Sequence, residues 1–187
     1  FIQHFEEPGS SITISSPVQG TVNNSSAYVS RISFQGSSSS SPLFQDTRGL
    51  RLEWNNNAAR YSFDLQTQTL NLNNFSFLSF RVGQSSESNN QVGQEQDFSL
   101  EIRASLGNVI TLNASSINKM LYPPLSELIR NSIVRAAFRR VVMQSFRMSL
   151  AELESQGLVI NQIERISLLF NVTNAGVLYF DELQVTN

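Results

Sequence analysis

The sequence predicts an all-β protein, an antiparallel β-sandwich of the jelly-roll type with one or two short inserted helices. Apolar and polar residues alternate with a period of two in about ten segments. Turn-forming residues separate these segments every ~8–15 residues. Helix and strand patterns do not alternate along the chain, as they would in a protein with a parallel sheet. We therefore expect residues 1–187 to form a single domain.

The first half of the chain contains four short alternating segments. Ser11–Ser15 alternates around two isoleucines, and Tyr28–Phe34 places every second side chain on one face. Leu50–Trp54 directs its apolar residues to one side, and Asn55–Asn57 is a turn signal. Because residues 60–65 alternate again directly after this turn, the sequence predicts a β-hairpin here.

The second half continues the same pattern. Phe75–Val82 is a strongly aromatic strand, and Phe98–Arg103 alternates apolar with polar residues. The turn Leu106–Asn108 leads into a strand over Val109–Leu112, and Val142–Met148 is a further strand. The chain closes with two apolar strands, 163–172 and 177–185, which are joined by a tight turn.

Two segments predict helices. Ser149 and Glu152 form a capping box and Gly157 is a stop signal, so Leu150–Gln156 should form one or two helical turns. Apolar residues recur at helical spacing after two prolines, which predicts a second helix over Ser126–Phe138.

Composition excludes several classes of function. A net charge of −2 argues against a nucleic-acid-binding surface. The absence of Cys excludes disulfides and zinc–thiolate sites, and a single histidine, His4, cannot supply a typical catalytic triad or transition-metal centre. No apolar run reaches the ~18 residues of a membrane span. We expect a monomer that is not an enzyme and that binds neither nucleic acid nor membranes.

Carboxylate pairs occur near both ends of the chain. Glu6 and Glu7 precede the first predicted strand, and Asp181 and Glu182 interrupt the last one. If Tyr179 and Leu183 point inward, Asp181 points inward with them, because side chains two apart share a face. Two interpretations fit the pairs: a structural calcium site with ligands from both ends, or carboxylates that face solvent on an edge strand.

Six residues are candidates for ligand binding: Arg51, Glu53, Arg81, Glu101, Arg103 and Tyr122. The charged ones alternate out of phase with the core residues of their strands. If these strands line one concave sheet, the charged residues form a polar floor that suits sugar hydroxyls or carboxylates. Tyr122 precedes two prolines and is a potential stacking platform for a sugar ring. The alternatives are cross-strand ion pairing on a solvated face and, for Tyr122, packing against the core.

Several segments together resemble the galactose-binding-like β-jelly rolls that serve as carbohydrate-binding modules in secreted bacterial polysaccharide-degrading enzymes. They occur in the same order along nearly the whole chain and comprise Phe5–Glu6, Gly49–Trp54, Leu78–Val82, Gln96–Ile102, Phe146–Leu150 and Leu178–Leu183. The resemblance implies two stacked antiparallel sheets. It also implies a structural calcium near the first and last strands, with Glu6 and Asp181 as ligands.

The same resemblance leads to two hypotheses about function. In the first, the chain is a non-catalytic module, located outside the cell as a cleaved or excised part of a longer enzyme, and it binds a polysaccharide on a concave sheet face or a loop rim. In the second, it is a structural or interaction domain that packs against a neighbouring catalytic domain, such as an esterase or another hydrolase, and has no sugar site.

Overall fold

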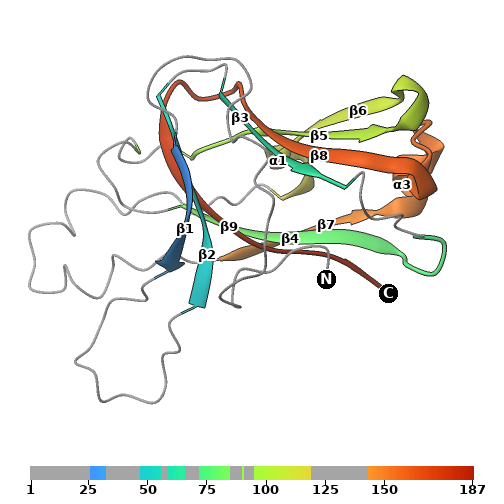
Figure 1. The fold of residues 1–187 in the computed structure, drawn as a ribbon, viewed down its shortest axis with the longest axis horizontal. Coiled ribbons are helices and arrows are strands. Elements are labelled where there is room, and N and C mark those ends of the chain that lie inside the picture. The colour runs from blue at the N-terminus through green and yellow to red at the C-terminus, as the bar shows by residue number, and fades with distance from the viewer. Residues whose placement is uncertain are drawn as a thin grey trace, which may run out of the picture.

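The computed structural model describes residues 26–32, 47–55, 59–65, 72–84, 90, 95–118 and 143–187. These residues form two stacked antiparallel sheets (Figure 1). The fold class is therefore the predicted β-sandwich. The predicted strand at 11–15, the predicted helix at 126–138, and the candidate residues Glu6 and Tyr122 lie outside the described residues.

One sheet, here called the β9 sheet, contains in spatial order β1 (Ser26–Ile32), β2 (Thr47–Trp54), β9 (Gly176–Thr186), β4 (Phe77–Gln84) and β7 (Gln144–Ser149). The β8 sheet contains β3 (Ala59–Asp64), β8 (Ile163–Phe170), β5 (Ser99–Ala104) and β6 (Val109–Asn113). From β3 onward, each strand lies in the sheet opposite to that of the strand before it, except β6, which follows β5 in the same sheet. This order is that of a jelly roll.

The predicted hairpin between residues 50–54 and 60–65 is wrong. β2 pairs with β1 and β9, whereas β3 pairs with β8 in the other sheet. The chain crosses the sandwich between β2 and β3, and the turn after β8 makes the same kind of crossing into β9. The alternation of apolar and polar residues shows which face of a strand is buried. The alternation is the same whether the following strand pairs with that strand in one sheet or packs against it from the other sheet, so it could not exclude the hairpin.

The core lies between the two sheets and is rich in aromatic rings. Trp54 on β2 stacks on Phe170 of β8 with ring centroids 4.2 Å apart, and its indole N–H donates to the carbonyl oxygen of Thr173 at 2.9 Å. Phe80 packs against Phe146 and Phe180 at 5.2 and 5.1 Å. The Trp54–Phe170 contact joins the two layers, whereas the Phe80 contacts connect neighbouring strands of the β9 sheet. Offset rings at 4.5–7 Å attract each other beyond their buried area.

One core residue keeps an unsatisfied polar atom. Tyr61 on β3 is buried, and its hydroxyl has no hydrogen-bond partner in the described ranges. Burial disfavours the phenolate and raises the pKa of Tyr61 from 10.0 to about 12.

Short helices lie at the ends of strands. α3 (Leu150–Ser155) confirms the predicted capping box, since the Ser149 hydroxyl accepts the backbone N–H of Glu152. Gly157 follows the helix with a φ of +97°, which confirms it as the stop signal. α1 (Ala114–Ile117) follows β6 and is tied to the start of β5 by Asp97, whose carboxylate accepts the Ser115 N–H and hydroxyl. No helix within the described ranges is long and apolar enough to cross a membrane.

Candidate ligand-binding faces

The structure divides the predicted ligand-binding residues between two outer faces. Arg51, Glu53 and Arg81 lie on strands of the β9 sheet. Glu101 and Arg103 lie on β5, in the β8 sheet. The expectation that these strands line one sheet is therefore not met, because the outer faces of a sandwich point away from each other. Each face has to be considered as a separate candidate surface.

Arg51 and Glu53 contact each other along β2. The Nη1 atom of Arg51 lies 2.6 Å from Oε2 of Glu53, and Arg51 is only 9% exposed. Residues two apart on a strand share a face, so this pair forms without any distortion of the backbone. The two charges thus pair along one strand, whereas the alternative interpretation of these positions was ion pairing across strands on a solvated face.

On the outer face of the β8 sheet, a row of side chains runs across all four strands. Ser62 on β3 is paired with Ser167 on β8, Ser167 with Glu101 on β5, and Glu101 with Thr111 on β6. We call these four residues the Glu101 row. The hydroxyls of Ser62 and Ser167 are hydrogen-bonded at 2.9 Å. Three short hydroxyl side chains and one carboxylate thus form a low strip across the sheet.

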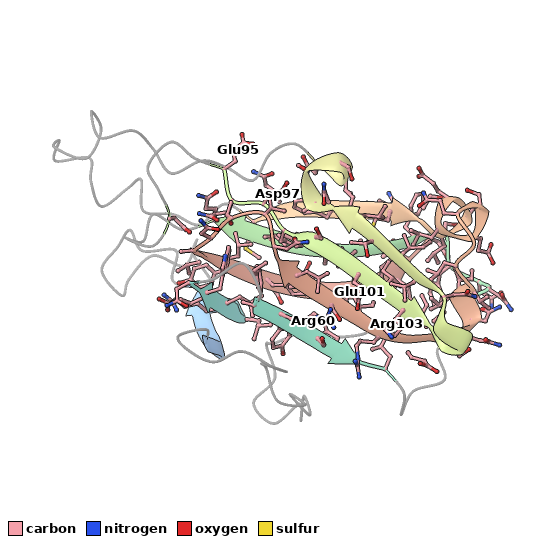
Figure 2. All side chains as sticks on the ribbon, turned by 90° about the horizontal axis from the view of Figure 1, so that it is seen from above. Arg60, Glu95, Asp97, Glu101 and Arg103 are labelled. Atoms are coloured by element: carbon pink, nitrogen blue, oxygen red, sulfur yellow. The ribbon has the colours of Figure 1, made fainter. Side chains whose placement is uncertain are left out.

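Two arginines flank the carboxylate of this row. Figure 2 shows Arg60 and Arg103 beside Glu101, while Glu95 and Asp97 lie apart from them. Nη2 of Arg60 is 3.5 Å from Oε2 of Glu101, and Nη2 of Arg103 is 3.8 Å from Oε1. Both separations exceed the ~2.7–2.9 Å of a charge-assisted hydrogen bond. Both are ion pairs without a direct hydrogen bond of ordinary length. A water or hydroxyl group that bridges the carboxylate and a guanidinium could form hydrogen bonds with both.

Glu101 is buried without full hydrogen bonding. Its side chain is 10% exposed, and within the described part of the chain its Oε1 atom has no hydrogen-bond partner, nor does Nε of Arg103. A buried polar atom without a partner is uncommon and needs an explanation, of which an absent ligand or water is one. The Glu101 row therefore combines an acceptor and a donor, both unsatisfied, at the centre of a sheet face.

A β-bulge in β9 determines where the terminal carboxylates point. Ser79 of β4 is paired with Gln184 and Arg81 with Asp181, so Phe80 faces two residues of β9 instead of one. Glu182 lies at the bulge with a φ of +51°. Phe180 and Leu183 are both buried in the core, an odd spacing that only the bulge permits.

The expected orientation of Asp181 is corrected by this geometry. Tyr179 is only partly buried and Phe180 occupies the core, so Asp181 does not share an inward face with Tyr179 and Leu183. Asp181 is still only 5% exposed, and its Oδ1 accepts the backbone N–H of Glu182 at 2.8 Å. Among the described residues no group of three or more His, Asp or Glu side chains could hold a metal ion. Calcium binding by Glu6 and Asp181 stays a prediction.

Beside the bulge, the outer face of the β9 sheet is hollowed into a groove of about 330 Å³. We call it the bulge groove, and its lining includes Ser79, Arg81, Ser145, Arg147, Glu182 and Gln184. Arg81 pairs with Glu182 across the groove, with Nε 3.0 Å from Oε2. Of the residues predicted for ligand binding, Arg81 is the one that lines this groove.

A third polar region lies at the first residues of β9, beside the end of β4, and most of its side chains are buried. Asn90 bonds both backbone groups of Val177: its amide N–H donates to the Val177 carbonyl at 2.9 Å, and its oxygen accepts the Val177 N–H at 2.7 Å. The Gln96 side-chain oxygen accepts the Thr173 hydroxyl, and the Gln96 backbone N–H donates to the side chain of Gln84. We call these four residues, Gln84, Asn90, Gln96 and Thr173, the amide cluster.

Sequence reasoning missed several residues of the two outer faces. Arg60, Ser62 and Ser167 join Glu101 only through the pairing of β3 with β8 and of β8 with β5. Arg147 and Glu182 meet Arg81 only through the pairing of β4 with its two neighbours and the bulge. An outward phase on each strand was the one available signal, and it does not show which strands are neighbours.

Comparisons with known proteins were made by sequence and by structure. No protein-family model matches the chain, and no curated protein matches it in sequence. Among solved structures, an exo-β-agarase is similar over 98% of this chain and 25% of its own length, with 13% identity and a TM-score of 0.54. The chain thus corresponds to about a quarter of that protein.

Two structures from Clostridium thermocellum are also similar. One is the family 30 carbohydrate-binding module of a cellulosomal cellulase, with 11% identity, a TM-score of 0.48, and coverage of 86% of this chain and 91% of that one. The other is a family 11 carbohydrate-binding module in complex with a β-1,3-1,4-mixed-linked tetrasaccharide, with 10% identity, a TM-score of 0.44, and coverage of 89% and 85%. At such identities a likeness shows the fold alone. The likeness to the agarase, together with the strand order, confirms the β-sandwich predicted from the sequence.

Proposed function

We propose that this chain is a non-catalytic carbohydrate-binding module, an accessory domain of a larger secreted enzyme, which binds a polysaccharide on the outer face of the β8 sheet. The observation that carries the proposal is the state of Glu101. Its side chain is nine-tenths buried at the centre of the Glu101 row, yet its Oε1 atom has no hydrogen-bond partner among the residues that the structure describes. The resemblance of the strand motifs to such modules supports the same function.

The chemistry of the row suits sugar hydroxyl groups. A hydroxyl group both donates and accepts, so it can donate to Oε1 of Glu101 while it accepts from a guanidinium N–H. Arg60 and Arg103 provide such N–H groups on either side of the carboxylate. A sugar hydroxyl inserted between Glu101 and Arg103 would replace their 3.8 Å separation with two hydrogen bonds of ordinary length.

The shape of the row supports an extended ligand. Ser62, Ser167 and Thr111 have short side chains, whereas the arginines on either side are long. The strip is therefore lower than its flanks, and it runs across the strands, which are rigid supports for a binding site. In this proposal Glu101 acts as a hydrogen-bond acceptor and not as a catalytic acid.

The test is a binding screen of the full chain against neutral plant, algal and bacterial glycans, followed by calorimetry with the best oligosaccharide. Glu101→Gln should weaken binding at least ~10-fold, because a bidentate charged acceptor is replaced by a weaker amide. Glu95→Gln is the matched control, since Glu95 is exposed and lies apart from the row (Figure 2), and it should bind like the wild type.

Two results would overturn the proposal. One is the absence of binding to every glycan of a broad panel. The other is a Glu101→Gln variant that binds as tightly as the wild-type protein. The first result would favour the second hypothesis, a structural domain that packs against a neighbouring catalytic domain.

A further inference from the structure

We infer that the bulge groove is a second ligand-binding site, for an acidic saccharide that carries a carboxylate or sulfate group beside its hydroxyls. The groove lies on the outer face of the β9 sheet, on the opposite side of the sandwich from the Glu101 row (Figure 1). Its volume of about 330 Å³ lies at the lower end of the ~300–1,000 Å³ range of ligand pockets. This inference does not depend on carbohydrate binding by the Glu101 row.

The bulge builds one wall of the groove. Residues in the left-handed region cost ~1–2 kcal/mol when they are not glycine, and Glu182 adopts a φ of +51° there. This conformation brings the Glu182 side chain to Arg81, with Nη1 3.3 Å from Oε1 and Nε 3.0 Å from Oε2. Bulges that re-aim a side chain in this way are common beside functional sites.

The floor of the groove consists of small polar residues between longer ones. Ser79 is paired with Arg147 on one side and Gln184 on the other, and Arg81 is paired with Ser145. Each serine thus lies next to an arginine of the neighbouring strand and leaves a depression beside it. Hydroxyl and amide groups in such a depression can donate to and accept from the hydroxyls of a sugar ring.

The charge of the groove favours an anion. Arg81 is compensated by Glu182. Arg147, in contrast, has no aspartate or glutamate partner among the described residues. Its guanidinium lies 3.6 Å from the centroid of the Phe77 ring, and its Nη2 donates to the main-chain oxygen of Asn187 at 2.9 Å. Counting these three charged side chains, two positive and one negative, the groove carries a net charge of +1.

Arg147 is also held in position to receive an anion. Stacking on Phe77 fixes the plane of the guanidinium, and the bond to Asn187 engages one nitrogen. A planar guanidinium binds carboxylate and sulfate oxygens through two parallel N–H groups. A saccharide placed in the groove with its anionic group at Arg147 would have its hydroxyls over Ser79 and Gln184.

The experiment measures binding of the full chain to three oligosaccharides of equal length: an oligogalacturonate, a sulfated galacto-oligosaccharide and a neutral galacto-oligosaccharide. We expect at least one anionic probe to bind ~10-fold or more tightly than the neutral probe at low salt, and its affinity to fall as salt is added. The comparison of the two anionic probes tells whether carboxylate or sulfate is preferred.

Two variants with opposite effects locate the binding. Arg147→Gln removes the positive charge that no aspartate or glutamate among the described residues pairs with, and it should weaken anionic binding at least ~10-fold, because charge-assisted bonds are the strong ones. Glu182→Gln removes the negative charge and should strengthen anionic binding several-fold. Arg165→Gln, a change of the same type on the β8 sheet, is the control and should leave anionic binding unchanged.

The inference would be overturned if Arg147→Gln bound anionic probes like the wild type, or if neutral and anionic probes bound equally. It would also be overturned if Glu101→Gln abolished anionic binding while Arg147→Gln did not, since binding would then belong to the other face. Failure of neutral glycans to bind at the Glu101 row would count against the proposed function alone.

Discussion

Two buried polar regions of this protein differ in how completely they are hydrogen-bonded. In the amide cluster, Asn90 bonds both backbone groups of Val177, and Gln96 bonds Thr173 and Gln84. On the β8 sheet, Oε1 of Glu101 and Nε of Arg103 have no hydrogen-bond partners among the described residues, although both atoms are buried. Both regions place polar groups inside the same sandwich. In the amide cluster these groups bond to other parts of the fold, and on the β8 sheet some of them do not.

The difference separates polar groups that hold the fold together from those that remain available for a ligand. The pairing of β4 with β9 ends at Gln84 and Leu178. At the next residue of β9, Val177, the Asn90 side-chain amide forms the two backbone hydrogen bonds that a neighbouring strand would otherwise provide. Such bonds stabilise the fold because the backbone groups would otherwise be buried without partners. The carboxylate of Glu101 satisfies no backbone group within the described residues, so its hydrogen-bonding capacity is available for binding. Changes in the first region should affect stability, and changes in the second should affect affinity.

The largest effect is expected from Gly176→Ala beside the amide cluster. An added Cβ would lie 2.6 Å from the Trp54 ring and 2.6 Å from the side-chain oxygen of Gln96. Trp54 is fully buried and stacked on Phe170, so it cannot move aside. We expect a loss of ~3 kcal/mol or more, from overpacking of a filled core. Thermal unfolding should show a melting temperature lower by ~6–12 °C. A shift below ~2 °C would contradict the packing described here.

The second-largest effect on stability is expected at Tyr61. Its hydroxyl is buried in the core and has no hydrogen-bond partner among the described residues. Its pKa is raised to about 12 in the folded protein and is 10.0 when unfolded. The stability contribution of the neutral phenol is complete below pH 10 and is lost as pH rises toward 12. Two pKa units correspond to ~3 kcal/mol. Wild-type stability should therefore fall by that amount relative to Tyr61→Phe across this window. Denaturant titrations of both proteins at pH 10 and at pH 12 measure this loss of stability. If wild type and Tyr61→Phe lost the same stability between the two pH values, the prediction would be contradicted.

Asn90→Ala should destabilise the protein by ~2 kcal/mol, because it leaves the N–H and C=O of Val177 buried without partners. Amide hydrogen exchange at Val177 should accelerate as well. Asn174→Ala changes the same residue type in the exposed turn before β9 and should alter stability by less than ~0.5 kcal/mol. Equal effects of the two substitutions would remove the distinction between the two regions.

The smallest effect on stability is expected at Glu101. Glu101→Gln removes two loose ion pairs, at 3.5 and 3.8 Å, and also the desolvation penalty of a buried carboxylate. These contributions oppose each other, so the free energy of unfolding should change by less than ~1 kcal/mol, as measured in urea. A loss of ~3 kcal/mol or more would assign Glu101 to the structural groups, together with the amide cluster.

The local features of the fold could be predicted from the sequence, and the pairing of strands could not. The capping box at Ser149 and the strand over Phe98–Arg103 depend on neighbouring residues, and the structure confirms them. The hairpin predicted around Asn55–Asn57 failed because β2 and β3 pack opposite each other across the core. The bulge at Glu182 has no local signal, since Glu182 is neither a glycine nor an asparagine.

The same limit applies to the candidate sites. The outward phase of Glu101 and Arg103 on β5 is a local property and could be predicted. That Arg60 reaches Glu101 depends on β8 lying between β3 and β5, a neighbour relation set by residues more than 60 positions away. Hydrophobic alternation is equal on all these strands, so it cannot select one neighbour over another.

The position of β8 and β9 has a consequence for synthesis of the protein. These last two strands of the chain are interior strands of their sheets, with β8 between β3 and β5 and β9 between β2 and β4. Until residues 163–186 have left the ribosome, each sheet consists of separate halves with unpaired inner edges. The two sheets therefore cannot close before β8 and β9 are synthesised, and a chain terminated after α3 would keep unpaired strand edges in both sheets, a form prone to aggregation.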